Sequence, residues 1–143
     1  PDTYKVNIGY MAGFIGIGEV SFGGENSLAR AKLAADIIYK RWNIIGITPL
    51  EYQMDYIGYN SLYKEHISKQ MCSGQPTEIR LRVAVRADTE INAAKLIREV
   101  QCLYINGPAG SSGIAAFTEP LLCIENILIP REHITEHIAL TEV

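Results

Sequence analysis

The sequence predicts an α+β protein in which helices cover one face of a mainly antiparallel sheet. Three observations support this fold class: segments that alternate apolar and polar residues, two segments with apolar residues every three or four positions, and the order of these segments along 143 residues. Alternation indicates a sheet with one buried and one solvated face, which favours antiparallel pairing. The length suits a single domain, which we expect to span residues 1–143.

The first segments predict two strands and a helix. "YKVNIGY" (Tyr4–Tyr10) and "GEVSF" (Gly18–Phe22) both have the alternation of strands. "NSLARAKLAADIIYKRW" follows, and it predicts an amphipathic helix because apolar residues recur at steps of three and four: Leu28, Ala31, Ala35, Ile38 and Trp42. Asn26 or Ser27 is expected to cap its N-terminus through a side-chain oxygen.

The middle of the chain predicts two more strands and a second helix. "EYQMDYIGY" (Glu51–Tyr59) alternates, residues 60–76 suggest a loop with a short helix, and "EIRLRVAVR" (Glu78–Arg86) alternates clearly. The inward positions of that last strand are Ile79, Leu81, Val83 and Val85. "DTEINAAKLIREVQCLYING" is expected to be a helix with Asp88 as N-cap, Gly107 after its end, and an apolar face that includes Tyr104.

The last part of the sequence is expected to be extended. "IAAFTEPLLCIENILI" contains Pro120, which implies an edge strand or a bulge, and "EHIALTEV" suggests one more strand. The six central elements then follow the order β-α-β-β-α-β. This order is that of the ferredoxin-like fold, here with extra strands at its ends.

Composition and charge exclude several functions. The net charge is −3 and no basic cluster is present, so we expect no nucleic-acid partner. No apolar run reaches the ~20 residues of a spanning helix, so we expect no membrane partner. Because three scattered cysteines indicate no secreted disulfide framework, we expect a cytoplasmic location. The three cysteines form no CxxC pair, and His133 and His137 have no third ligand nearby. We therefore expect no metal and no cofactor.

Glycine is concentrated in two stretches. "GFIGIGEVSFGG" holds five glycines in twelve residues before the first helix, but it matches neither GxGxxG nor GxxxxGK[ST], so tight turns and bulges are favoured over a phosphate cradle. "NGPAGSSG" (Asn106–Gly113) follows a helix. It predicts either a helix C-cap with a flexible continuation or a loop that lines a ligand, and both interpretations stay open.

Two groups of charged residues could carry chemistry. Arg80, Arg82 and Arg86 lie on one face of their strand, where they could bind a carboxylate or phosphate. Pairing with Glu51 and Asp55 on a neighbouring strand is favoured for them. Glu19 is flanked by glycines and would be a general base if a crevice buried it, although a surface glutamate is the more common outcome.

Five blocks of the sequence resemble a known family. They are "VNIGYMAGFIGIGEVSFGGENSLARAKLAADII", "DYIGYNSL", "EIRLRVAVRA", "CLYINGPAGSSG" and "ILIPREHI". In order and spacing they resemble the C-terminal portion of the AtuA-like (acyclic terpene utilisation) proteins, long carried as a domain of unknown function. The family-like positions are Gly9, Tyr10, Gly13, Gly16, Gly18, Glu19, Gly24, Asn106, Gly107, Pro108, Ala109, Gly110 and Gly113. The chain departs from the family at Met11-Ala12, at Ile17 and in the long polar segment 63–76.

The resemblance implies a longer protein and a class of substrate. Family members carry a larger N-terminal α/β domain, and the chain begins Pro1-Asp2-Thr3 without methionine, so we expect a C-terminal domain or fragment. The family is associated with breakdown of acyclic terpenes such as citronellol and geraniol through coenzyme A thioesters. Its catalytic chemistry is unassigned, so the resemblance supplies no catalytic residue.

Together these observations predict a domain that lines a carboxylate or CoA-thioester site shared with an upstream N-terminal domain or a separate partner chain. The alternative is a non-catalytic module for assembly or for binding a small regulatory ligand, and a homo-oligomer is expected. Glu19 is the candidate catalytic residue. The candidate ligand-binding residues are Gly16, Gly18, Gly23, Gly24, Arg82, Gly107, Gly110, Ser111 and Ser112.

Overall fold

The computed structural model describes residues 1–71 and 74–140. Along the chain the elements are β1 (Thr3–Gly23), α1 (Ser27–Ile45), β2 (Glu51–Ile57), α2 (Lys64–Met71), β3 (Glu78–Ala87), α3 (Glu90–Asn106), β4 (Ser111–Pro130) and the 3₁₀ helix η1 (Arg131–His133). They form two compact units, residues 1–12 with 122–143 and residues 13–121. Strands β1 and β4 each contribute residues to both units. The expectation of a single domain over residues 1–143 stays a prediction.

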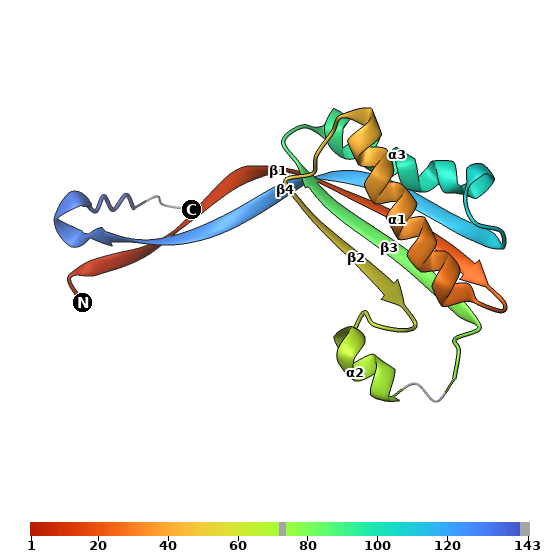
Figure 1. Cartoon of the computed structure of the whole chain (residues 1–143). Helices are drawn as coiled ribbons and strands as arrows, with labels where there is room; N and C mark the ends of the chain where they lie inside the picture. The colour runs from red at the N-terminus through yellow and green to blue at the C-terminus, as the bar shows by residue number, and fades with distance from the viewer. Residues whose placement is uncertain (72–73, 141–143) are drawn as a thin grey trace. The chain divides into compact units, whose positions relative to one another are not determined.

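Residues 13–121 form the ferredoxin-like unit. Its sheet has the strand order β2-β3-β1-β4, with β3 antiparallel to both of its neighbours (Figure 1). The order of elements, β1-α1-β2-β3-α3-β4 with α2 inserted before β3, gives the split β-α-β-β-α-β topology. The α+β, ferredoxin-like fold predicted from the sequence is confirmed. Pro120 lies in β4, which is an edge strand of this sheet as predicted.

One face of this sheet packs against α1 and α3. The inward residues predicted for β3 are all buried, and Val20 and Phe22 of β1 join them. From the helices come Ala31, Ala34, Ala35, Ile38, Trp42, Ala93, Leu96, Ile97, Val100 and Leu103. The Trp42 indole N–H donates to the Leu96 carbonyl at 3.0 Å, which ties α1 to α3 within the core. The apolar face of α3 differs from the prediction at one position, because Leu103 is buried and Tyr104 is exposed.

The N-cap prediction for α1 was right in residue and wrong in its side-chain bond, whereas the N-cap of α3 is one residue later than the predicted Asp88. Asn26 is the N-cap residue of α1, but it has a left-handed backbone (φ 58°) and its side chain makes no capping bond. Ser27 instead donates its hydroxyl to the Pro76 carbonyl at 2.6 Å. At α3 the N-cap is Thr89, whose hydroxyl accepts the Asn92 amide, while the neighbouring Asp88 accepts the Asn92 side-chain amide. That side-chain bond lowers the pKa of Asp88.

Two strand predictions were wrong. The strands expected at 4–10 and 18–22 are parts of one continuous strand, because the intervening glycines are accommodated within β1. Gly13, with φ 108°, takes a conformation that other residues rarely adopt. The strand expected at the C-terminal end is absent from its described part, residues 136–140, which are irregular. Residues 141–143 lie outside the described residues.

The second unit contains the first residues of β1 and the last residues of β4. Local contacts join the N-terminal residues to the residues after β4: the Arg131 amide donates to the Asp2 carbonyl, and the Tyr4 hydroxyl donates to Glu136 at 2.8 Å. The bond to Glu136 raises the pKa of Tyr4. The Arg131 guanidinium also lies over the Tyr4 ring, 4.4 Å from its centroid.

Candidate functional site

The candidate site lies on the face of the sheet in residues 13–121 that the helices do not cover. Alternation along β3 places Arg80, Arg82 and Arg86 on that face, opposite the buried aliphatic residues of the same strand. The register pairs Glu19 of β1 with Arg82, and Ser21 with Arg80. Because residues that face one another across antiparallel strands have neighbouring side chains, the sheet brings these groups together.

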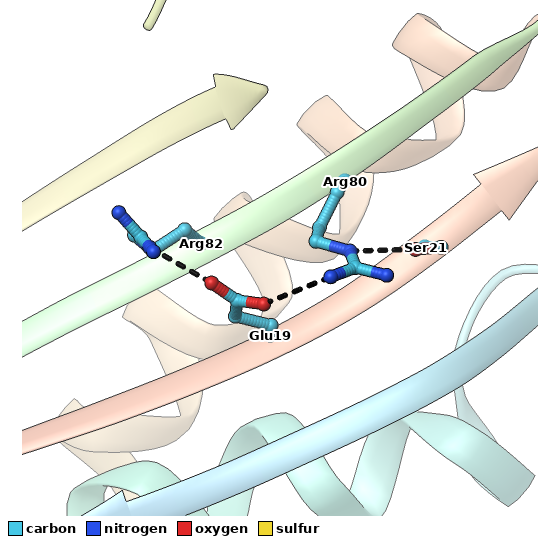
Figure 2. Close-up of polar contacts among 4 residues, drawn as sticks. All are labelled: Glu19, Ser21, Arg80 and Arg82. Atoms are coloured by element: carbon cyan, nitrogen blue, oxygen red, sulfur yellow. Dashed lines mark hydrogen bonds and ion pairs between the residues drawn. The ribbon is translucent and has the colours of Figure 1, made fainter. Parts of the chain in front are cut away.

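Glu19 is held between two guanidinium groups (Figure 2). Arg82 donates its Nε–H to Glu19 Oε1 at 2.8 Å, and Arg80 donates from Nη1 to Oε2 at 3.3 Å. Arg80 also donates its Nε–H to the Ser21 hydroxyl at 3.1 Å. The structure therefore brings together Glu19 and Arg82, two of the residues selected from the sequence, and adds Arg80 and Ser21 to them.

The two arginines keep donors for a further partner. The Glu19 side chain is only 14% exposed, whereas Arg80 and Arg82 are 46% and 49% exposed. Among the described residues, Glu19 is the sole hydrogen-bond partner of the Arg82 side chain, which bonds through its Nε–H alone. A hollow of about 390 Å³ adjoins the pair and is lined by Glu19, Ile57, Gly58, Glu78, Arg80 and Arg82. Half-exposed guanidinium groups beside a hollow can bind a carboxylate or a phosphate.

The third arginine behaves as a structural residue. Arg86 donates to Glu51 of β2 at 2.7 Å, which is the cross-strand pairing favoured from the sequence. The predicted pairing of Asp55 with an arginine is wrong, because its ionic partner is Lys64 at 3.6 Å. A second hollow of about 330 Å³ lies beside Arg86, and most of its lining is apolar or uncharged: Ile15, Glu51, Tyr52, Gln53, Ala84, Val85, Arg86 and Leu121.

Two of the candidate glycines face the helices. A Cβ atom at Gly16 would lie 2.6 Å from Ile97 Cγ1, and one at Gly18 would lie 2.9 Å from Val100 Cγ2. Both distances are below ordinary van der Waals contact, so these glycines let α3 approach β1 closely. They occupy the side of the sheet opposite the charged cluster, and a role for them in ligand binding stays a prediction.

The two glycine-rich loops meet at one end of the sheet. The Gly23 amide donates to the Gly110 carbonyl at 3.2 Å. Arg30 of α1 donates to the carbonyl oxygens of Ala109, Gly23 and Glu25, so one guanidinium joins both loops. Gly24 and Gly110 have positive φ angles, 82° and 77°, which explains glycine at these positions. The carbonyl groups around Arg30 give the junction a structural basis without a ligand.

The other candidates from the second loop lie in different surroundings. Gly107 ends α3 and donates its amide to the Leu103 carbonyl at 2.9 Å, as expected for a helix cap. Ser111 and Ser112 are the first residues of β4. Gly113 comes nearest to the charged cluster, because a Cβ built there would lie 3.6 Å from Ser21 Oγ and 3.9 Å from Arg80 Nη2.

Sequence reasoning missed three residues of this region. Ser21 could have been found from its alternation with Glu19, since the two share a face of β1. Gly113 belonged to the recognised loop, but only strand pairing reveals its neighbours. Arg30 gave no signal, because its role depends on the meeting of two loops far apart in the sequence. No group of three or more His, Cys, Asp or Glu residues able to hold a metal ion occurs within 1–71 and 74–140.

The fold and this cluster define a ferredoxin-like α+β protein with two arginines and a glutamate on its open sheet face. The family model described as "Acyclic terpene utilisation family protein AtuA" matches residues 1–140. The chain therefore belongs to the AtuA family, and the resemblance noted in the sequence is confirmed. No curated relative and no solved structure matches the chain. None of the described helices is long and apolar enough to cross a membrane.

Proposed function

We propose that this chain contributes an anion-binding surface to a site for a carboxylate or CoA-thioester substrate, and that an upstream domain or a partner chain completes that site. The observation that carries the proposal is the pair of half-exposed guanidinium groups, Arg80 and Arg82, beside a hollow of about 390 Å³. Membership of the AtuA family is consistent with it, since the resemblance implies catabolism through CoA thioesters.

Directed N–H donors, rather than net charge, support a single bound anionic group, because two glutamates and two arginines line the hollow. Glu19 holds both guanidinium groups in place and leaves several of their N–H donors directed toward the hollow. Glu78 lines the same hollow and opposes an anion. We therefore expect Glu78→Gln to tighten binding of an anion, and Arg82→Gln to weaken it.

A second surface is needed because the hollow is built from one side only. All its lining residues belong to β1, to β3, to the end of β2 or to Gly58, the residue that follows β2. Ligand sites bury roughly 70–90% of a small ligand's surface. One face of a sheet does not enclose a ligand to that extent, so an upstream domain or a partner chain would cover the remainder.

The test is a titration of this chain, followed by NMR, with butyrate and with acetyl-CoA as probes. Both should bind with millimolar dissociation constants and shift the amide resonances of Arg80 and Arg82. The double variant Arg80→Gln/Arg82→Gln should weaken binding by about tenfold or more. Arg98→Gln, on the exposed side of α3, removes one charge elsewhere and should have little effect. Equal weakening by the control, or no weakening by the double variant, would refute the site.

The role of Glu19 needs the intact protein. As a general base it would be essential for turnover, so Glu19→Ala should abolish activity while the thermal midpoint stays nearly unchanged. If Glu19 only positions the arginines, the substitution Glu19→Gln should raise KM far more than it lowers kcat. The two roles are separated by measuring both kinetic constants.

A second candidate function is assembly, and one observation favours it. On β4, Leu122, Ile124 and Leu128 share a face by alternation, and all three are about 70% exposed in the unit formed by residues 1–12 and 122–143. Exposed apolar stripes often mark association surfaces. Native mass spectrometry of the wild type and of Ile124→Lys tests this function, because a homo-oligomer assembled through this strand should dissociate in the variant.

A further inference from the structure

A groove lies between α1 and α3. It has a volume of about 330 Å³ and is lined by Ile37, Arg41, Glu99, Cys102, Leu103 and Asn106. None of these residues belongs to the sheet, so the groove is separate from the proposed carboxylate or thioester site on the open face. Its volume falls within the range of ~300–1,000 Å³ that is typical of pockets for small ligands.

Glu99 is the unusual residue of this groove. Its side chain is only 9% exposed, and the other buried residues of this part of α3 are apolar: Leu96, Ile97, Val100 and Leu103. A carboxylate at such a position loses hydration that only a cation or hydrogen-bond donors can replace. Because apolar residues in place of a buried ion pair are often neutral or stabilising, stability alone does not explain a glutamate here.

The ion pair of Glu99 leaves an acceptor and several donors free. Arg41 donates its Nε–H to Glu99 Oε2 at 2.8 Å, and neither side chain makes another hydrogen bond within the described residues. Glu99 Oε1 therefore has no partner there, and it stays accessible to solvent. The Nη1 and Nη2 groups of Arg41, whose side chain is 46% exposed, are likewise unpaired among the described residues. A free acceptor and free donors thus lie on adjacent side chains of the groove.

A zwitterion matches this arrangement of charges. An ammonium group would donate to Glu99 Oε1 and a carboxylate would accept from Arg41, and both bonds are of the charge-assisted kind, which is the stronger one in proteins. The ligand and the ion pair each have no net charge, so no unbalanced charge enters the groove. Leu103 is 3% exposed and Ile37 is partly buried, which gives the groove an apolar wall for an aliphatic side chain.

We propose that the groove between α1 and α3 binds a small α-amino acid with an aliphatic side chain, such as leucine. Its ammonium group pairs with Glu99, its carboxylate pairs with Arg41, and its side chain packs against Ile37 and Leu103. Because the groove contains no residue of the sheet, the amino acid does not compete with an anion on the open face.

The experiment compares three probes that share a branched aliphatic chain, with binding followed by NMR. L-Leucine carries both charged groups, isoamylamine lacks the carboxylate, and isocaproate lacks the ammonium group. Leucine should shift the amide resonances of Ile37, Cys102 and Asn106, and each of the other probes should bind the groove about tenfold more weakly or less. Equal binding of all three in the groove, or leucine shifts confined to Arg80, Arg82 and their neighbours, would overturn the proposal.

Cys102 supplies a second readout inside the groove. Its side chain is exposed, so iodoacetamide should alkylate it, and Cys123 of β4 is a thiol outside the groove that serves as the control. Leucine at about ten times its dissociation constant should slow alkylation of Cys102 by roughly tenfold and leave that of Cys123 unchanged. Peptide mass spectrometry measures both rates. An unchanged rate at Cys102 would contradict binding in the groove.

Three variants test the ion pair itself. Glu99→Gln keeps the size of the side chain and removes the charge that attracts ammonium, while Arg41→Gln removes the partner of the carboxylate. Each should weaken leucine binding by about tenfold or more. Lys95→Gln removes an exposed charge one turn earlier on α3 and should leave the affinity within about twofold.

The thermal midpoint of each variant shows whether it is folded, and the comparison of probes needs no variant at all. Unchanged leucine affinity in folded Glu99→Gln would overturn the proposal. Weakening by Lys95→Gln as large as that by Glu99→Gln would overturn it as well.

Discussion

The two faces of the sheet in residues 13–121 are made by the same strands and serve different purposes. On β3, Leu81 is completely buried against the helices, while its neighbour Arg82 is half exposed and reaches Glu19 on the other face. Packing therefore determines the residue type on one face. On the other face it leaves room for charged residues, whose identity is explained by what they bind.

Glycine shows the same difference. Gly16 and Gly18 are required where α3 packs against β1, whereas Gly23 has no atom within 4 Å of the position of a Cβ. The density of glycine in this stretch thus has two causes, close helix packing and a loop junction around Arg30. The prediction of tight turns and bulges accounts for Gly13 and Gly24, which have positive φ angles, and it did not anticipate close packing.

The largest difference between the faces should appear in the paired variants Leu81→Ala and Arg82→Ala. The first leaves a cavity in the core and should lower the free energy of unfolding by about 2–5 kcal/mol. The second removes a half-exposed arginine while Arg80 still pairs with Glu19, so it should lower the free energy of unfolding by less than about 1 kcal/mol. Chemical denaturation of both variants measures this, and similar losses would show that the open face also carries the stability of the fold.

Arg41 and Glu99 form an ion pair between the helices on the covered side. Glu99 is buried and accepts the Arg41 Nε–H at 2.8 Å, and this bond raises the pKa of Arg41. Arg41→Ala leaves the buried Glu99 carboxylate unpaired and should lower the free energy of unfolding, by less than for a fully buried pair because Arg41 is half exposed. The double variant Arg41→Ala/Glu99→Leu should recover most of the lost free energy of unfolding, as measured by urea denaturation. A double variant as unstable as Arg41→Ala would contradict this explanation.

The glycines give a matched test within one strand. Gly18→Ala should lower the free energy of unfolding by about 1–3 kcal/mol, because the new methyl group overlaps Val100 and Ile97. Gly23→Ala should be neutral or slightly stabilising, since the site is open and the unfolded chain loses entropy. Thermal denaturation of both variants separates the two uses of glycine. Equal destabilisation would disprove the distinction.

The smallest effect is a pH dependence at α2. Glu65 of α2 accepts hydrogen bonds from Lys32 and from Lys69. The bond from Lys32 first, and that from Lys69 second, lower the pKa of Glu65 from its ordinary value of 4.5. A lowered carboxyl pKa in the folded state stabilises the fold above the unfolded value, and this contribution is lost as the pH falls through the folded value. The thermal midpoint of Glu65→Gln should thus lie slightly below that of the wild type at pH 7 and converge with it at acidic pH. A gap that persists at acidic pH would exclude the ion pairs as its cause.

Much of the fold could be predicted because it depends on local patterns. Alternation identified β2 and β3, the helical period identified α1 and α3, and their order gave the ferredoxin-like topology. The continuity of β1 was missed because glycines usually end strands, and here neighbouring strands and α3 hold the glycine-rich chain extended. The left-handed cap at Asn26 likewise has no sequence signature that would distinguish it from a side-chain cap.

The candidate site was predictable only in part. Glu19 and Arg82 were each selected for local reasons, but their contact depends on the pairing of β1 with β3. The partner of Asp55 was misassigned, because Lys64 is the first residue of α2 and sequence patterns do not place that helix beside β2. The roles of Arg30 and of the Arg41–Glu99 pair both depend on tertiary surroundings that a single sequence does not reveal.

The central claim is that the open face binds an anion without contributing much to stability. Its most direct test is one variant, Arg82→Gln, measured both for acetyl-CoA affinity by NMR titration and for the free energy of unfolding by urea denaturation. We predict that affinity falls about tenfold while the free energy of unfolding changes by less than about 1 kcal/mol. Unchanged affinity, or a loss of stability as large as that of a core variant, would contradict the account.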